Sequence, residues 1–472
     1  MRYVRRRKRS SLGGGLSHSI RALFSMTVIV ALVLMLPVVI ALFKPMYVVI
    51  HRIDPDLLIE VSNKGKAIAY ITVKGTVKVP EPLRIWRFGD ITIYKVYIDA
   101  ETLDRLKSMK NVVSIYGAKK FSHAPLYSLD PDEYPFRDVD IDNKFHRVGR
   151  WIGRGVTVAI IDTGIDYTHP DFYDENNRTV IKVLVSMFYV NPSGQYIFWE
   201  PYKNGTMEDL LNFDMDLWRQ YGEPAFLDIN GHGTHVAGII AGRGWASSGK
   251  YLGVAPATEL VIIKAFNKDG EASIDTCLEA LEWVYNNTEK YDIKVLSLSW
   301  GASFASDGRD PVSLSVNAIA GKGVLVFAAA GNEGNLPTTV VVPAVAERAF
   351  AVGAWDAYYD RLAPFSSLGP TIDMRMKPDL VAAGVMVVSC KSQFVDFPDE
   401  YEVGEYYVAL SGTSMSTPVA AGIAADFIEY FRYWYGRDPT INEFIKWVEE
   451  NSRHINMFKD FITGVGIPIA PR

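Results

Sequence analysis

Cysteine is scarce in this sequence: Cys277 and Cys390 are the only two among 472 residues. Cys277 falls on a stretch typical of a helix, and Cys390 follows a stretch typical of a strand, so we expect two buried small apolar side chains. Their scarcity argues against a disulfide framework, and two such scattered cysteines provide no metal site. The sequence also lacks internal repeats.

Acidic residues are missing from residues 1–21, which carry a charge of +7. The whole chain has a net charge of −5, so the remainder carries −12, and no nucleic-acid-binding surface is expected. Residues 22–43 hold no charged side chain, and this run is long enough to span a bilayer. A buried core helix of this length would show a polar face, and this one has none. We therefore predict a basic cytoplasmic tail at 1–21 and a transmembrane helix at 22–43.

The basic residues also predict the orientation of this helix. Because cytoplasmic flanks are rich in Lys and Arg, everything after Lys44 is expected outside the cytoplasm. A cleaved signal peptide is the alternative, but the apolar run is long for one, and no small-residue cleavage site follows Phe43. The sequence favours a single-pass protein of the cell membrane, with secretion after processing as the other outcome.

The rest of the chain has the composition of a folded protein and divides into three parts. Hydrophobic residues make up 49% and charged residues 22%, which is enough for a core. Residues 45–125 predict a small α+β domain, with strands at 46–50, 67–73, 91–98 and 111–116 and a helix at 100–110 that follows Asp99. Residues 126–148 are rich in Pro, Asp, Ser and Tyr and predict a linker, so that residues 149–472 form the last domain.

Residues 149–472 alternate short apolar strands with helices. Continuous apolar strands separated by helical segments are typical of a parallel sheet covered on both faces, so we predict an α/β fold with a doubly wound, mostly parallel sheet. The long mixed segment 172–228 is expected to be an insertion or elaborated loops. The expected strands are residues 156–162, 259–266, 295–300, 324–330 and 350–355.

An acid and a histidine lie at the expected crevice of this sheet. Asp162 ends the first strand, and ligands of open parallel sheets bind beyond the carboxyl ends of the strands. A lone aspartate there would equally cap the strand end as an Asx-turn. His232 lies in a glycine-rich stretch that begins a buried helix. His232 and His235 have the spacing of a helical metal pair, but no third ligand accompanies them, so His235 is expected to be a buried, hydrogen-bonded histidine.

An amide and a serine follow the same pattern. Asn332 comes after the apolar strand 324–330 and offers a neutral donor that stabilises an oxyanion. Alone, it would be interpreted as a turn asparagine. Ser414 lies in the first turn of a slim helix (410–427), where unpaired N–H groups and the helix dipole favour negative charge. Alone, an N-capping serine is the simpler interpretation.

Together, the four residues point to nucleophilic catalysis. All fall at strand ends or helix starts of one sheet, and their order, Asp…His…Ser, is known for nucleophilic triads. The stretches DTGID, GHGTHVAG, AAAGNEG and SGTSMSTP resemble the four signatures of the subtilisin-like serine proteases. The resemblance runs from about Pro135 to the C-terminus. A serine esterase on an α/β-hydrolase would want Gly-x-Ser-x-Gly and the order Ser…Asp…His, and neither is seen.

The resemblance implies a role for each residue. Ser414 corresponds to the nucleophile and His232 to the general base and acid. Asp162 corresponds to the residue that orients the imidazole, and Asn332, with the Ser414 N–H, to the oxyanion hole. The substrate would be an extended polypeptide that adds as a strand between two edges of the protein, and the chemistry requires no cofactor. The implied substrate-binding residues are Ser299, Trp300, Gly301, Gly270, Glu271, Ala272, Gly331 and Val341.

The sequence departs from the family pattern at two functional places. Val341 stands where many members have a glycine in the specificity pocket, so we predict a shortened pocket and a small or medium apolar residue before the scissile bond. The loop that carries calcium in many members is replaced by residues 242–251. A structural calcium ion near Asp171 and Asp174 is the alternative, and a solvated acidic loop is the simpler interpretation.

The resemblance also reinterprets residues 45–125, which lie where the family carries a propeptide that acts as an intramolecular inhibitor and folding template. Large parallel sheets fold slowly, which is why a template would help. Cleavage in the linker would release the catalytic domain, residues 149–472, from the anchor. The alternative from another class is a catalytically inactive, membrane-tethered peptide-binding protein that uses the same cleft.

Overall fold

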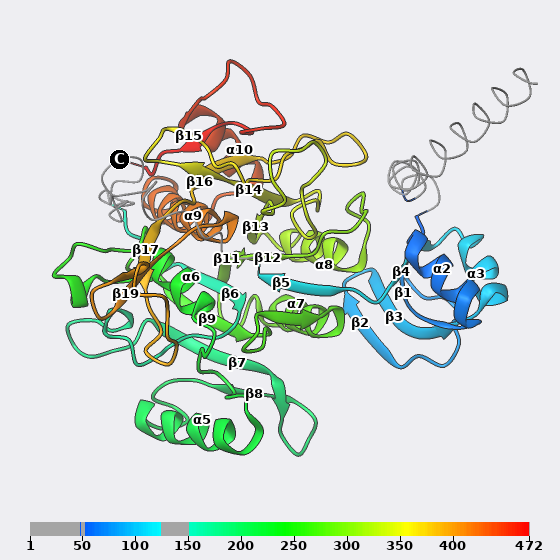
Figure 1. Cartoon of the computed structure of the whole chain (residues 1–472), viewed down its shortest axis with the longest axis horizontal. Helices are drawn as coiled ribbons and strands as arrows, with labels where there is room; N and C mark the ends of the chain where they lie inside the picture. Colours follow the sequence, from blue (N-terminus) through cyan, green and yellow to red (C-terminus); the bar gives the residue numbers. More distant parts are fainter. Residues whose placement is uncertain (1–47, 49–51, 124–150, 472) are drawn as a thin grey trace, which may run out of the picture.

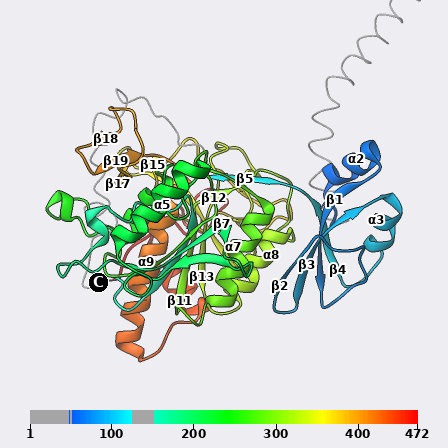
Figure 2. The ribbon, with the colours of Figure 1, turned by 90° about the horizontal axis from the view of Figure 1, so that it is seen from below.

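The structure is a computed structural model that describes residues 48, 52–123 and 151–471 (Figure 1). They form an N-terminal unit, residues 52–117, and a large unit, residues 151–471. The two units lie side by side in both views and are joined by a single extended strand (Figure 2).

Three predicted segments lie outside the described residues: the basic tail at 1–21, the transmembrane helix at 22–43 and the linker at 126–148. Within the described ranges, no helix combines the length and the apolar character needed to cross a membrane.

The N-terminal unit is an antiparallel sheet with the strand order β2-β3-β1-β4, covered on one face by two helices. The helices α2 (Pro55–Lys64) and α3 (Ala100–Lys107) begin after Asp54 and Asp99, whose carboxylates accept N–H groups of the first turns. The strands predicted at 67–73, 91–98 and 111–116 and the helix predicted after Asp99 are confirmed, whereas α2 and β2 were not predicted. Of the strand predicted at 46–50, the structure describes residue 48 alone, and that residue is helical. The strands are β1 (Ala67–Lys74), β2 (Arg84–Phe88), β3 (Ile91–Ile98) and β4 (Val112–Gly117).

The large unit is built on a nine-stranded sheet in the order β15-β14-β13-β11-β6-β9-β7-β8, with β16 beside β14. Only β8 and β15 pair antiparallel, so the predicted mostly parallel α/β sheet is confirmed. The segment predicted as an insertion holds β7, β8 and the helix α5 (Met207–Tyr221), which were not predicted. The strands are β6 (Thr157–Asp162), β7 (Ile181–Val190), β8 (Tyr196–Trp199), β9 (Glu259–Lys264), β11 (Ile293–Leu298), β13 (Leu325–Ala329), β14 (Ala349–Asp356), β15 (Arg361–Leu362) and β16 (Leu380–Ala383).

Helices cover both faces of this sheet because successive strand residues point to opposite sides. On β6, Val158 and Ile160 face one core, and Ala159 and Ile161 face the other. The helices α6, α9 and α10 cover the first core, and α7 and α8 cover the second (Figure 1). Their bounds are α6 (His232–Ala241), α7 (Ile274–Asn287), α8 (Pro311–Ala320), α9 (Thr413–Tyr435) and α10 (Ile441–Glu450).

The free face of the N-terminal sheet packs on α7 and α8 of the large unit. Trp86 is fully buried in the core beneath these helices. Polar contacts surround it: the hydroxyl of Tyr70 donates to Asp275 at 2.7 Å, and Arg84 forms an ion pair with Glu279 at 3.0 Å. The N-terminal unit is therefore docked on the large unit mainly by apolar burial, with hydrogen bonds and ion pairs around the buried centre.

Strand β5 (Lys120–His123) leaves the N-terminal unit and inserts into the large unit (Figures 1 and 2). It is the central strand of a three-stranded antiparallel sheet, between β10 (Glu271–Ser273) and β12 (Trp300–Gly301). The space between β10 and β12 is called the channel below. β5 was not predicted from the sequence.

Candidate active site

Asp162 and His232 meet at the carboxyl end of the sheet. Asp162 is the last residue of β6, and His232 is the first residue of α6. Oδ1 of Asp162 lies 2.7 Å from Nδ1 of His232, and both side chains are buried. Thr163 donates its N–H to the same carboxylate oxygen at 2.8 Å. A carboxylate bound in this way favours the tautomer protonated at Nδ1 and leaves Nε2 as the basic nitrogen.

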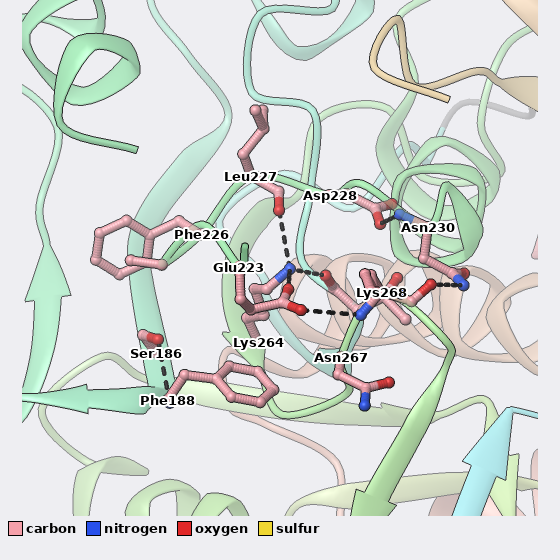
Figure 3. A network of polar contacts seen from close by, with 12 residues as sticks. Ser186, Phe188, Glu223, Phe226, Leu227, Asp228, Asn230, Lys264, Asn267 and Lys268 are labelled. Atoms are coloured by element: carbon pink, nitrogen blue, oxygen red, sulfur yellow. Dashed lines mark hydrogen bonds and ion pairs between the residues drawn. The ribbon is translucent and has the colours of Figure 1, made fainter. Parts of the chain in front are cut away.

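A buried lysine holds the two loops that carry this pair. Lys264 ends β9 directly opposite Asp162 in the register. Its Nζ donates to the carbonyl oxygen of Thr163 at 2.9 Å. It also donates to the carbonyl oxygen of Leu227 at 2.9 Å and forms an ion pair with Glu223 at 2.8 Å (Figure 3). Thr163 follows the acid, and Leu227 precedes the histidine loop. One ammonium group therefore fixes the spacing of both loops.

Asp228 extends this support to the start of α6. Its carboxylate accepts from the N–H groups of Gly231 and Thr234, both at 2.8 Å, and from the Thr234 hydroxyl at 2.7 Å. Burial alone would raise the pKa of Asp228, but the charge of Lys264 and these hydrogen bonds outweigh it and hold the pKa below its usual value. Asp228 is thus an anion at the N-terminus of the helix that carries the histidine, which the helix dipole favours.

His235 is buried and hydrogen-bonded, as its position in the apolar helix predicts. Its Nε2 lies 3.0 Å from the carbonyl oxygen of Val387 and 3.1 Å from that of Val408. Burial, followed by the charge of nearby His232, lowers the pKa of His235 to about 3. In the part of the chain that the structure describes, it belongs to no cluster of metal-ligating side chains.

Ser414 and Asn332 lie together at the start of α9. Ser414 lies in the first turn, as its sequence context predicts, and it is fully buried. Oδ1 of Asn332 accepts from both the N–H and the hydroxyl of Thr413 at 2.9 Å. This fixes the amide so that its donor, Nδ2, lies 3.2 Å from where a Cβ of Gly412 would be. The amide donor and the first turn of α9 are therefore neighbours.

The hydroxyl of Ser414 is not hydrogen-bonded to His232 in this structure. It donates to the carbonyl oxygen of Ser299 at 2.9 Å, and the Ser299 hydroxyl donates back to the carbonyl oxygen of Ser414 at 2.9 Å. Nε2 of His232 is buried and has no hydrogen-bond partner among the described residues. Pairing the two groups requires a rotation about the Cα–Cβ bond of Ser414, and such bonds are often absent before substrate binds.

The two segments predicted to bind substrate both pair with β5. Ser122 lies opposite Glu271 on one side and opposite Gly301 on the other. Ala272 and Trp300 pair with the residues that flank Ser122. A strand of the chain itself therefore occupies the place predicted for substrate.

Two side chains of β5, those of Phe121 and His123, contact aromatic rings of the large unit. Phe121 is buried edge-on against Trp300, with ring centroids 5.6 Å apart. His123 stacks on His232, with ring centroids 4.6 Å apart and an interplanar angle of 14°. Ser122, between them, is exposed. The strand thus touches both the channel wall and the proposed general base.

Val341 narrows a small cavity beside the channel. A Cβ at Gly301 would lie 2.5 Å from a methyl group of Val341, and one at Gly331 would lie 2.7 Å from the other. The cavity has a volume of about 140 Å³, and Asn332 and Glu333 also line it. Its size is that of a small or medium side chain.

The two acids predicted as cation ligands have different surroundings. Asp171 is fully buried, and its carboxylate accepts from the Tyr407 hydroxyl at 2.8 Å and the Ala246 N–H at 3.0 Å. Asp174 is partly exposed and accepts from backbone N–H groups of its own turn, including that of Arg178 at 2.8 Å. The structure explains both acids by hydrogen bonding, and a calcium ion near them stays a prediction.

Sequence reasoning missed four residues of the site: Phe121, His123, Asp228 and Lys264. Lys264 had a detectable signal, because it closes an apolar strand at an inward register position, where a lysine must find partners. Asp228 stands four residues before His232 and is typical of a helix-start acceptor. β5 had no such signal, since the short polar sequence KFSH becomes a strand only through distant partners.

Comparison with known proteins agrees with this geometry. Residues 153–456 match a family model described as the subtilase family. The chain is 36% identical over 288 residues to serine protease AprX of Bacillus subtilis (strain 168), which covers 58% of this chain and 57% of that protein. It is 30% identical over 342 residues to the thermophilic serine proteinase of Bacillus sp. (strain AK1), covering 68% and 69%. The chain thus spans little more than half the length of the first of these relatives.

Among solved structures, sphericase is similar with a TM-score of 0.53 at 23% identity, covering 71% of this chain and 98% of that chain. This similarity shows a shared fold. None of these proteins is named as an inactive peptide-binding protein, so the comparisons do not support that alternative.

Proposed function

The chain belongs to the subtilase family, and we propose that it is a serine endopeptidase acting on extended polypeptides through an acyl-enzyme on Ser414. The observation that carries the proposal is the buried 2.7 Å contact between Asp162 and His232, whose Nε2 is left for a proton from Ser414.

In the first half of the reaction, Ser414 Oγ attacks the substrate carbonyl carbon while His232 Nε2 takes the hydroxyl proton. Asp162 stabilises the imidazolium that results. Nδ2 of Asn332 and the Ser414 N–H donate to the oxyanion. His232 then gives its proton to the leaving amine as the C–N bond breaks, which leaves an ester on Ser414.

In the second half, a water molecule gives a proton to His232 and attacks the ester carbonyl carbon, with the same donors on the oxyanion. The C–O bond to Ser414 then breaks, and the histidine returns its proton to the serine. No cofactor takes part in these steps.

The substrate binds as an added strand in the channel, in the position of β5. Its backbone pairs with Gly270–Ala272 on one side and Ser299–Gly301 on the other. The residue before the scissile bond fills the cavity beside Gly331 and Val341, so small or medium apolar side chains are preferred. Good cleavage after Phe or Tyr in a peptide library would refute this preference, and Val341→Gly should extend cleavage toward larger residues.

Residues 45–125 act as a propeptide that serves as folding template and inhibitor, because they deliver β5 into the channel. The anchor at 22–43 holds the unprocessed chain in the cell membrane with residues 149–472 outside the cytoplasm. Cleavage beyond β5 would release the catalytic domain from the anchor, which makes it a secreted enzyme.

Intact mass of the full chain, as wild type and as Ser414→Ala, tests the proposal. We expect only the wild type to be trimmed after β5, and only the wild type to digest casein. If both proteins stay whole and the wild type still digests casein, the enzyme is permanently tethered. If neither protein is trimmed and neither digests casein, the endopeptidase is refuted and the peptide-binding alternative takes its place.

A further inference from the structure

The imidazole of His123 lies in a slot at the centre of the site. One face of this imidazole stacks on the ring of His232, with centroids 4.6 Å apart and an interplanar angle of 14°. The bare backbone of Gly270 closes the end of the slot, at the edge of the His123 ring. A Cβ built on Gly270 would lie only 1.8 Å from Nε2 of His123 and 2.0 Å from its Cδ2, but 3.0 Å from Cε1. A side chain at residue 270 would therefore fill the end of the slot that the ring now occupies.

The register of β5 relates this slot to the scissile bond. His123 pairs with Trp300, and the next position toward the nucleophile is Ser299, whose carbonyl oxygen accepts the Ser414 hydroxyl at 2.9 Å. A peptide bound in the register of β5 presents the carbonyl of the residue opposite Ser299 to the serine. The slot then receives the side chain of the residue immediately before that one.

We propose that this slot selects substrates with a planar ring, histidine or an aromatic residue, at the second residue before the scissile bond. The inference rests on the proposed endopeptidase function and specifies its substrate class. Two rings stacked with an offset attract each other, and the branched side chain of Leu or Ile has no flat face to stack on His232.

The same contact acts on the reaction itself. His232 becomes an imidazolium during proton transfer, and a cation over the face of a ring is stabilised electrostatically. The ring contact is therefore stronger in the transition state than in the bound substrate, and it raises kcat more than it lowers KM.

Four fluorogenic peptides test the slot with the full chain after it has processed itself: Phe-Ser-Xaa-Ala, with Xaa as His, Phe, Leu or Ala. Leu matches the rings in bulk without being planar. We expect the His and Phe peptides to exceed the Leu and Ala peptides in kcat/KM by about three- to tenfold, the size of one ring pair. Equal rates for all four peptides would overturn the slot and leave the proposed function standing. Hydrolysis of none of them would overturn the endopeptidase itself.

A variant pair links the selectivity to Gly270. Gly270→Ala should reduce the ratio of His to Ala peptide hydrolysis to about one, whatever its effect on total activity. Gly249→Ala is the matched control, because Gly249 also has a positive φ, of 86° against 71° at Gly270, but no atom within 4 Å of its built Cβ. An unchanged ratio in Gly270→Ala, or the same loss in Gly249→Ala, would contradict the slot.

Discussion

The pair formed by Asp162 and His232 is held by more buried polar contacts than the pair formed by Ser414 and Asn332. Behind the first pair lie a buried ammonium, a buried carboxylate and the N–H of Thr163, all within hydrogen-bond distance of the two loops. The second pair depends on Thr413 for the amide and on the carbonyl oxygen of Ser299 for the hydroxyl.

The difference separates two parts of the site. The fold positions the acid–base pair, whereas the hydroxyl of the nucleophile still has to reorient when substrate binds. Asp162 and Lys264 end adjacent strands, and Lys264 holds the loop that precedes His232, so the core of the sheet sets the geometry of the acid–base pair before any substrate binds. The hydroxyl of Ser414 can rotate about one bond. The carbonyl oxygen of Ser299, which now accepts its hydrogen bond, belongs to the channel wall. Binding in the channel is therefore expected to influence the nucleophile more than the base.

Asp162→Asn should lower kcat more than the other substitutions do, because it disrupts the acid–base pair. The neutral amide no longer favours the Nδ1-protonated tautomer, and we expect kcat to fall by about 10⁴-fold, as in other serine proteases with this change. Steady-state kinetics on one peptide measures it. A loss of less than tenfold would mean that the carboxylate only caps β6.

Asn332→Leu should disrupt the oxyanion hole and cause a smaller loss of kcat. Removing one oxyanion donor lowers kcat by about 10²- to 10³-fold, a magnitude established for subtilisin, with KM nearly unchanged. Leu also removes the acceptor for Thr413, so Asn332→Asp serves as the matched control that keeps it. If the activity of Asn332→Asp equals that of wild type, the amide is not an oxyanion donor.

Lys264→Met tests whether the buried ammonium positions the acid–base pair. Two carbonyl oxygens and Glu223 would lose their partner, and a shift of the loops by about 1 Å can cost about 10²-fold in rate. We expect kcat to fall by about that amount and the downfield proton NMR signal of the His232 Nδ1–H to weaken. Lys182→Met is the control, since Lys182 pairs with Glu259 at 2.8 Å elsewhere on the sheet. An unchanged NMR signal would mean that Lys264 is only structural.

The smallest expected effect is a pH dependence of the docking of the N-terminal unit, which places β5 in the channel. Burial under the N-terminal unit raises the pKa of Glu279 above its ordinary 4.5, although the ion pair with Arg84 opposes this. A raised pKa means that the docked state binds the proton more tightly, so docking is strongest below about pH 4.5 and weakens as pH rises through the raised value. The full chain should gain peptidase activity faster at higher pH.

Glu279→Gln, which is neutral at every pH, should flatten this dependence by keeping the N-terminal unit docked at high pH. Glu289→Gln, at an exposed position beyond the end of α7, is the control. If both variants activate with the pH profile of wild type, Glu279 does not control release.

Sequence reasoning predicted the parallel sheet and the four residues at its carboxyl end because each signal is local. An apolar strand followed by Asp162, or a helix of small residues beginning near Ser414, is visible within ten residues of the chain. Some residues that support these four side chains lie far from them in the sequence. Lys264 contacts carbonyl groups 37 and 101 residues away, and only the fold brings them together.

The N-terminal unit shows the same limit. Strands β1, β3 and β4 are rich in Val, Ile and Tyr and were predicted, whereas β2, with the sequence RIWRF, has charges on its exposed positions and was not. β5 is held by backbone hydrogen bonds to strands about 150 residues or more away, so its own sequence carries little of its conformation.

The three-stranded sheet of β10, β5 and β12 has a consequence for which proteins can be digested. A bound chain must offer free N–H and C=O groups along both of its edges, and a folded protein has already used these groups in its own helices and sheets. Only a segment that has opened over several residues can enter. The rate of attack on a folded target would then follow the free energy of its local opening, so that two proteins carrying the same cleavable sequence are digested according to their stability.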